Sequence, residues 1–176
     1  MALLDIRYDP DPVLREKARR IKTFDANLRK LAEDMLQTMH ANNGVGLAAP
    51  QIGQSIRLLV AELEPDKQEG ERGFKVALCN PEIVKASDET VTGTEGCLSI
   101  PGWVGDVPRH VSVTVKAQTT EGKEVRIKAQ DYYARVLQHE IDHLNGVLFT
   151  DRIEDISSLH RISPDATEEE EHLLEV

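Results

Sequence analysis

His139-Glu140-Ile141-Asp142-His143 is the stretch of sequence that decides the fold. Two histidines four residues apart lie on one face of an α-helix, one turn from each other. In that register both imidazoles can reach one metal ion, and Glu140 lies beside the open coordination position, where it can move protons. The stretch therefore predicts a metal-binding helix that carries its own general base.

The residues around this stretch predict the helix and its burial. Asp131 is a candidate N-cap, no Gly or Pro interrupts residues 133–144, and Gly146 follows the last apolar residue as a stop. Apolar side chains recur along one face, at Tyr133, Val136, Leu137, Ile141 and Leu144. Because the histidine face also turns inward, we expect a central, buried helix. The alternative is a surface helix whose histidines pair with their neighbours.

Length and composition predict one globular domain. The chain has 176 residues, of which 40% are hydrophobic, and it has no apolar run of membrane-spanning length and no signal-peptide pattern. Cys79 and Cys97 could pair in principle, but a cytosolic protein keeps its thiols reduced. Cytoplasmic placement is therefore the default expectation, with no membrane association.

The net charge of −10 is concentrated at the C-terminus. Residues 154–176 hold eight acidic residues against one arginine. Neither half of the chain has a basic excess, so we expect no direct nucleic-acid binding. We assign residues 1–152 to a single catalytic domain and residues 153–176 to an acidic C-terminal extension, either a polar helix or a disordered tail.

A second helix is predicted over residues 25–41. Leucines and methionines recur there with helical spacing, and Asp25 is a fair N-cap. The methionines are interpreted as core filler and not as ligands. Before this helix, residues 1–20 are typical of an extended arm with Asp-Pro turns.

Alternation of apolar and polar residues predicts strands. Residues 56–61 and 74–78 are strand candidates, the Asn80-Pro81 pair is expected to break the second one, and residues 82–86 are expected to extend again. Residues 111–117 and 125–129 alternate clearly on both sides of a glycine turn. This pattern predicts a hairpin with one buried face that leads directly into the metal helix.

Two further stretches hold residues that could complete a site. The first, Gly44-Val45-Gly46-Leu47-Ala48-Ala49-Pro50-Gln51, lacks the glycine spacing and the Lys-Ser/Thr ending of a phosphate loop. Its small residues instead indicate that another chain or a substrate approaches the main chain closely. Gln51 offers an amide donor, although loop capping is the simpler interpretation. The second, Glu95-Gly96-Cys97-Leu98-Ser99, ends just before a Pro-Gly turn.

Two histidines hold a metal weakly, so a third protein ligand is required, with one position left for water. The residues alone leave several candidates, namely Cys97, Asp142, another histidine, or a downstream acid such as Asp151, Glu154 or Asp155. Asp142 is disfavoured because it points away from the histidine face, and the other histidines have no ligand-like spacing. An acidic third ligand would indicate a zinc-type metallopeptidase, which is the alternative function.

The chain resembles the peptide deformylase family. Three motifs occur in the family's order, at residues 44–51, 95–99 and 138–144, and the similarity extends from about residue 5 to about Arg152. The departures are small, such as Val45 where isoleucine is common. The resemblance implies an α+β fold in which antiparallel sheets pack around the central metal-binding helix. It also implies that Cys97 is the third metal ligand, with His139 and His143.

The resemblance further implies a reaction, the hydrolysis of the N-formyl group on the first methionine of a new polypeptide, with release of formate. Metal-activated water attacks the formyl carbon, and Glu140 accepts its proton and gives it to the leaving amine. The Gln51 amide and the Leu98 backbone N–H would hold the oxyanion. The substrate backbone would bind as an added strand against residues that include Val45, Gly46 and Gly96.

The same resemblance implies a cofactor and partners. A thiolate with two imidazoles suits Fe(II), Zn, Co or Ni. We expect one divalent ion per chain, Fe(II) in the cell, with Zn, Ni or Co possible in purified protein. The expected partners are N-formyl-methionyl nascent chains at the ribosome, met by a monomer, and an ion pair of Glu95 with Arg109 is expected behind the site. A non-catalytic peptide-binding module is disfavoured, because the ligands, Glu140 and Gln51 are all intact.

Overall fold

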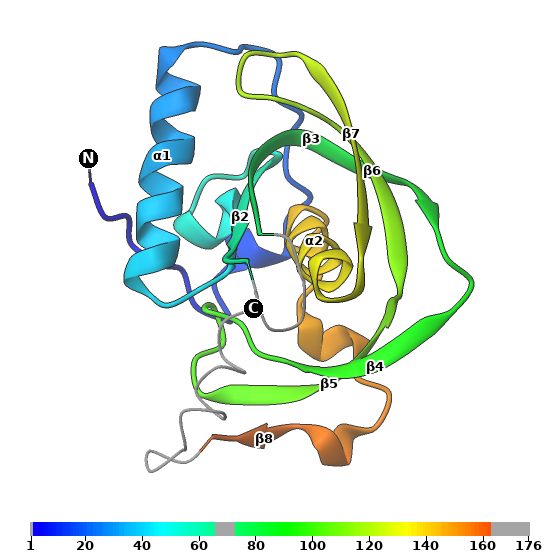
Figure 1. Cartoon of the computed structure of the whole chain (residues 1–176). Helices are drawn as coiled ribbons and strands as arrows, with labels where there is room; N and C mark the ends of the chain where they lie inside the picture. Colours follow the sequence, from blue (N-terminus) through cyan, green and yellow to red (C-terminus); the bar gives the residue numbers. More distant parts are fainter. Residues whose placement is uncertain (1, 66–72, 163–176) are drawn as a thin grey trace.

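The computed structural model describes residues 2–65 and 73–162. Within these residues the strands form a five-stranded sheet, in the order β1-β2-β3-β6-β7, and a three-stranded sheet, in the order β4-β5-β8. Neighbouring strands in both sheets run antiparallel. Helix α2 (Asp131–Leu144) lies in the hollow of the curved strands, as Figure 1 shows. The predicted α+β fold, with antiparallel sheets around a central helix, is confirmed.

The larger sheet comprises β1 (Gly46–Ala48), β2 (Leu58–Leu63), β3 (Phe74–Ala86), β6 (Ser112–Gln118) and β7 (Glu124–Gln130). The smaller sheet comprises β4 (Thr90–Glu95), β5 (Trp103–His110) and β8 (His160–Arg161). Short 3₁₀ helices connect these elements, at η1 (Pro12–Arg15), η2 (Ala49–Ile52), η3 (Phe149–Arg152) and η4 (Ile156–Ser158).

Helix α2 is buried along most of its length, as predicted. Every residue from Ala134 to Leu144 is buried. Its apolar side packs into a core that includes Leu59 of β2 and Val115 of β6. The expected N-cap was wrong, because Gln130 precedes the helix and Asp131 is its first residue, with a φ of +51°. Strand β7 thus runs into α2 without a loop.

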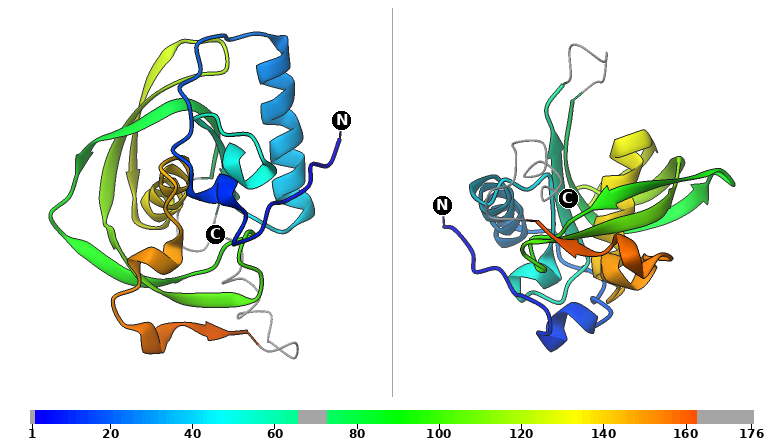
Figure 2. Two further views of the ribbon diagram at one scale, coloured as in Figure 1. Left: turned by 180° about the vertical axis from the view of Figure 1, so that it is seen from behind. Right: turned by 90° about the horizontal axis from the view of Figure 1, so that it is seen from below.

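Helix α1 (Ala26–Ala41) covers the outer side of the larger sheet, where it packs against β2. The Asp25 side chain accepts a hydrogen bond from the Leu28 amide at 2.9 Å, so the predicted N-cap is confirmed. Met35 and Met39 are fully buried in the core between helix and sheet, as expected of core filler. Figure 2 shows the strands between α1 and α2.

Sequence alternation predicted the β6–β7 hairpin correctly but missed other strands. Asn80-Pro81 does not end strand β3 but lies within a register shift between Cys79 and Glu82. The strand continues to Ala86, as the expected further extension over 82–86 requires, with a second shift between Ile83 and Lys85. Asn80 accommodates the first of these shifts with a φ of +51°. The β4–β5 pair was not predicted, and it is the pair that delivers Cys97 to the helix.

The chain after Arg152 returns to the smaller sheet. Trp103 and Val104 of β5 pair with β8, so part of the expected acidic extension forms regular structure. Residues 163–176, which hold most of that extension, lie outside the described residues. No helix in the described ranges is both long and apolar enough to cross a membrane.

Candidate metal centre

Helix α2 presents His139, Glu140 and His143 to one buried site. The exposed fractions of the three residues are 2%, 1% and 1%. The two Nε2 atoms lie 3.2 Å apart, because residues four apart stack on one helix face. The predicted helical spacing therefore brings both rings to a common point.

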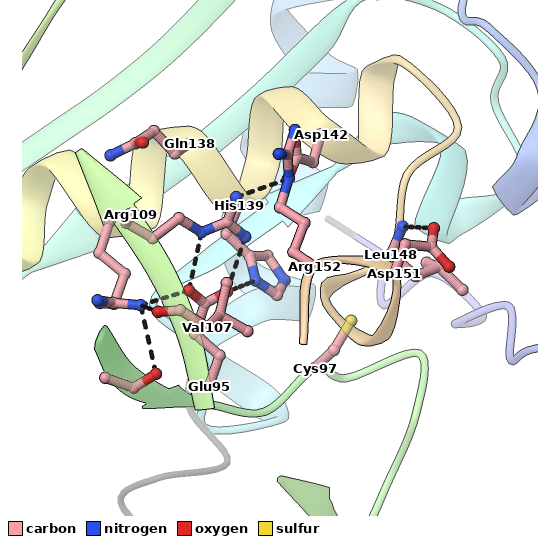
Figure 3. Close-up of polar contacts among 12 residues, drawn as sticks. Glu95, Cys97, Val107, Arg109, Gln138, His139, Asp142, Leu148, Asp151 and Arg152 are labelled. Atoms are coloured by element: carbon pink, nitrogen blue, oxygen red, sulfur yellow. Dashed lines mark hydrogen bonds and ion pairs between the residues drawn. The ribbon is translucent and has the colours of Figure 1, made fainter. Parts of the chain in front are cut away.

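Cys97 reaches the same point from the smaller sheet. It follows the end of β4 by two residues, and its Sγ lies 3.3 Å from the His143 Nε2 atom. Among the described residues, Cys97, His139 and His143 form a group whose ligand atoms all lie within 4.8 Å of one another. Figure 3 shows Cys97 on the chain that faces the helix bearing His139.

The other candidates for a third ligand have different roles. Asp142 binds Arg109 and Arg152, and the Asp151 carboxylate accepts from the Leu148 amide at 3.0 Å. Asp155 caps η4. The histidines expected at the surface, His40, His110 and His160, are exposed, and His172 lies outside the described residues.

The three side chains fit a divalent ion. A tetrahedral centre with bonds of about 2.0–2.3 Å separates its ligand atoms by about 3.3–3.8 Å, close to the separations of the sulfur and the nitrogens around His143. A thiolate and two imidazoles are the ligands that borderline-soft divalent metals prefer. The His143 Nδ1 atom is buried without a hydrogen-bond partner in the described part of the chain, so its Nε2 atom is the one directed at the other ligands.

The electrostatics of the site favour a positive charge between these ligands. Burial alone would lower the pKa of His139, but the Cys97 sulfur and the Glu95 carboxylate outweigh it and raise the pKa to about 10. Burial lowers the pKa of His143 well below its ordinary value, and the charge on His139 lowers it further. The Cys97 sulfur and the Glu95 carboxylate therefore favour a positive charge at His139, where a metal ion would displace the proton, and His143 stays neutral, which is the form that coordinates a metal.

Glu140 carries a carboxylate that is buried in the site. Neither of its oxygens has a hydrogen-bond partner in the described residues. Burial raises its pKa to about 7, a value suited to proton transfer near neutral pH. A Cβ at Gly46 would lie 2.4 Å from its Oε1. The main chain at Gly46 is thus approached closely by this carboxylate, whereas the approach of another chain or a substrate, which the glycine-rich stretch predicted, stays a prediction.

Gln51 both caps its loop and faces the site. Its Oε1 accepts from the Ala48 amide at 2.8 Å, as the simpler interpretation predicted. Its Nε2 lies 3.6 Å from the Cys97 sulfur and 3.3 Å from the Ser99 hydroxyl. Leu98 follows Cys97 directly and is half-buried, whereas Gly96 is buried. The candidate oxyanion donors therefore come from the two chain segments that flank the ligands.

Strand β1 is an edge strand, with β2 on one side. The Val45 carbonyl accepts from the Glu62 amide at 2.9 Å, so its hydrogen-bonding capacity is used within the sheet. The next residue, Gly46, lies opposite Ala61. Because hydrogen-bonded and non-hydrogen-bonded residue pairs alternate along antiparallel strands, the N–H and C=O of Gly46 point away from β2, toward the open edge. Of the three predicted substrate-binding residues, Val45 and Gly46 lie here, and Gly46 is the one of these two that can pair with an added strand.

Behind His139 lies a buried ionic network that sequence reasoning found only in part. The expected ion pair is present, with the Arg109 Nη2 atom 2.8 Å from the Glu95 Oε1 atom, and both side chains are almost fully buried. The same Oε1 atom lies 2.8 Å from the His139 Nδ1 atom. Arg135 and Asp142 complete the network and were not predicted to act there. Figure 3 shows Glu95 and Arg109 beside His139.

Comparison with known proteins identifies close relatives. A family model described as polypeptide deformylase matches residues 3–158. The peptide deformylase of Thermomicrobium roseum is 55% identical over 170 residues, or 96% of each chain. The crystal structure of peptide deformylase from Thermotoga maritima matches with a TM-score of 0.81 at 43% identity, over 88% of this chain and 100% of that one. A class I type b peptide deformylase from Acinetobacter baumannii, with Met-Ala-Ser bound, matches with a TM-score of 0.80 at 37% identity, over 86% and 99%.

Proposed function

The chain belongs to the polypeptide deformylase family, which removes the N-formyl group from nascent peptides, and we propose that Cys97, His139 and His143 hold the metal for this reaction. The observation that carries the proposal is the convergence of one sulfur and two Nε2 atoms from distant parts of the chain. When bound, a divalent metal activates water and polarises the formyl carbonyl.

Glu140 moves the protons in this proposal. Its carboxylate accepts a proton from the attacking water and gives it to the amine that leaves when the formyl C–N bond breaks. Two features support the role: neither oxygen has a hydrogen-bond partner in the described part of the chain, and burial raises the pKa to about 7. A carboxyl group with that pKa can both accept and return a proton near neutral pH.

The remaining site residues bind and orient the peptide. Gly46 pairs its outward peptide groups with the substrate backbone, which extends the larger sheet by one strand at β1. Val45 and Gly96 line the two sides of this strand position. The Gln51 Nε2 and the Leu98 backbone N–H donate to the oxygen of the formyl group as negative charge develops on it. The Met-Ala-Ser bound to the Acinetobacter baumannii relative supports a short peptide beginning with methionine as the ligand.

The proposed function also implies a metal ion, a substrate and a cellular location. The ligand set suits Fe(II) in the cell, with Zn, Ni or Co as substitutes. We further propose that the protein meets the formylated end of a nascent chain at the ribosome, in the cytoplasm. We propose that the protein acts as a monomer, since the candidate metal ligands of this chain already form one group. Residues 1–152 carry all of these groups, in keeping with the single catalytic domain that we propose.

Formate release from formyl-Met-Ala-Ser tests the function. The metal-loaded protein should release formate, and Glu140→Gln, which keeps the side-chain shape and all three ligands, should be slower by about 10²–10⁴-fold at unchanged metal content. An equal rate in the two proteins would contradict the role of Glu140. Cleavage of an internal peptide bond without formate release would instead favour the metallopeptidase.

A further inference from the structure

Arg135 lies one helical turn before His139 and is buried, with 8% of its side chain exposed. Its Nη1 donates to the Glu95 Oε2 at 2.7 Å and to the Val107 carbonyl at 2.9 Å. Its Nη2 donates to the Val91 carbonyl at 2.8 Å. One guanidinium therefore joins helix α2 to β4 through Val91 and Glu95, and to β5 through Val107.

The Glu95 carboxylate has four lone-pair sites, and the network fills all four. Oε1 accepts from the Arg109 Nη2 and the His139 Nδ1, both at 2.8 Å. Oε2 accepts from the Arg109 Nε at 2.9 Å and from Arg135. Arg135 thus supplies the last donor, and without it the carboxylate could rotate about its Arg109 contact and loosen its bond to His139.

The same contacts fix the strand that supplies the third ligand. Glu95 is the last residue of β4, and Cys97 follows it by two residues. A Cβ at Gly93 would lie 3.0 Å from the Arg135 Cζ, so the strand passes directly against the guanidinium. Sliding β4 along α2 would carry Cys97 away from the two histidines.

We propose that Arg135 is a positioning residue of the metal centre, which sets the register of β4 against α2 and thereby the distance of Cys97 from His139 and His143. The proposal rests on the proposed ligand set. Outer partners that orient ligands typically change metal affinity by about 10–100-fold when they are removed. Lysine cannot replace this arginine, because one ammonium on a flexible stem cannot hold the strand carbonyls and the carboxylate in one plane.

The test compares Arg135→Met and Arg135→Lys with Arg152→Met, measured by Zn(II) binding against a competing chelator. Arg152 is a matched control because it pairs with Asp142 at the outer end of the network and is 46% exposed in its side chain. Both Arg135 variants should weaken Zn(II) binding by about 10–100-fold and lower kcat at unchanged KM. Arg152→Met should change Zn(II) binding by less than about threefold, because Arg152 is itself half-exposed and Asp142 keeps its ion pair with Arg109.

A second readout reports the ligand geometry directly. The thiolate absorption band of the Co(II)-loaded protein should shift in both Arg135 variants and stay unchanged in Arg152→Met. If Arg135→Met does not fold, Arg135→Lys decides the question, because it keeps the buried charge. Wild-type Zn(II) affinity and spectrum in a folded Arg135→Lys, or an equal loss in Arg152→Met, would overturn the proposal. Failure of the wild-type chain to bind Zn(II) would overturn the ligand set itself.

Discussion

At the residue scale, the site depends on how closely the main chain approaches one carboxylate. A Cβ on Gly46 would lie 2.4 Å from the Glu140 Oε1, a distance that real side chains do not tolerate. The conflict is with the end of a side chain and not with backbone, so the fold can survive if Glu140 moves. Gly46 therefore keeps the proton-transfer group in place.

Gly46→Ala should lower kcat at least about tenfold while the protein stays folded and binds metal, because the added methyl group displaces the Glu140 carboxylate. Formate release and zinc content measure the two effects. The double variant with Glu140→Gln should be no slower than Glu140→Gln alone, since there is no base left to displace. Additive losses in the double variant would show that Gly46 acts elsewhere, for example on substrate pairing.

Some individual residues of the site could not be predicted from the sequence. The spacing of His139, Glu140 and His143 was sufficient to predict half of the site. The residues alone left the third ligand open between Cys97, several acids and another histidine, because a ligand distant in the chain leaves no periodic pattern. Only the family resemblance implied Cys97. The role of Arg135 was not predicted for another reason. An arginine on a helix is usually exposed to solvent, whereas Arg135 is buried because it pairs with a buried carboxylate from another element.

At the element scale, the helices and the β6–β7 hairpin were predictable, because their apolar residues follow the periods of helix and strand. Strand β5 was not, because its inward positions include Gly105 and Arg109 in place of a hydrophobic series. Strand β4 buries only Glu95, so it shows no apolar alternation at all. Strands β4 and β5, which carry Glu95 and Arg109 of the ionic network behind His139, therefore cannot be predicted from apolar alternation.

The end of α2 gives an element-scale prediction. Gly146 has a φ of +72°, and a Cβ there would lie 2.4 Å from the Arg15 carbonyl in η1. Left-handed backbone strain alone costs about 1–3 kcal/mol. Gly146→Ala should destabilise the protein by more than this, because the added methyl group also meets the Arg15 carbonyl. Gly102→Ala is the matched control, since Gly102 has a φ of +80° but no atom of the described residues within 4 Å of its Cβ position. Equal losses in urea unfolding would show that the contact with η1 is unimportant.

At the scale of the whole molecule, the core should respond to alkaline pH. Burial raises the pKa of the Cys79 thiol from 9.0 to about 11. The folded chain therefore keeps this proton at pH values where the unfolded chain has lost it. The protonated thiol therefore makes its full contribution to the free energy of unfolding below about pH 9. As the pH rises toward 11 the free energy of unfolding falls by on the order of 2 kcal/mol. Tyr133, whose pKa burial raises to about 12, acts in the same direction at higher pH.

Urea unfolding at pH 8 and pH 10.5 measures this effect. The free energy of unfolding of the wild type should fall more steeply between these pH values than that of Cys79→Ala, which has no thiol to ionise. Cys79→Ala should also be less stable at both pH values, because it leaves a cavity in the core between α1 and the larger sheet. Identical pH dependence in the two proteins would contradict burial as the cause.

The whole molecule converges on one point: the larger sheet holds α2 with its two histidines, and the smaller sheet brings Cys97 to them. X-ray absorption spectroscopy of the zinc-loaded protein tests this most directly. We predict a first shell with one sulfur at about 2.3 Å and two imidazole nitrogens at about 2.0–2.1 Å, and loss of the sulfur in Cys97→Ser. A wild-type shell of nitrogen and oxygen without sulfur would contradict the proposed centre.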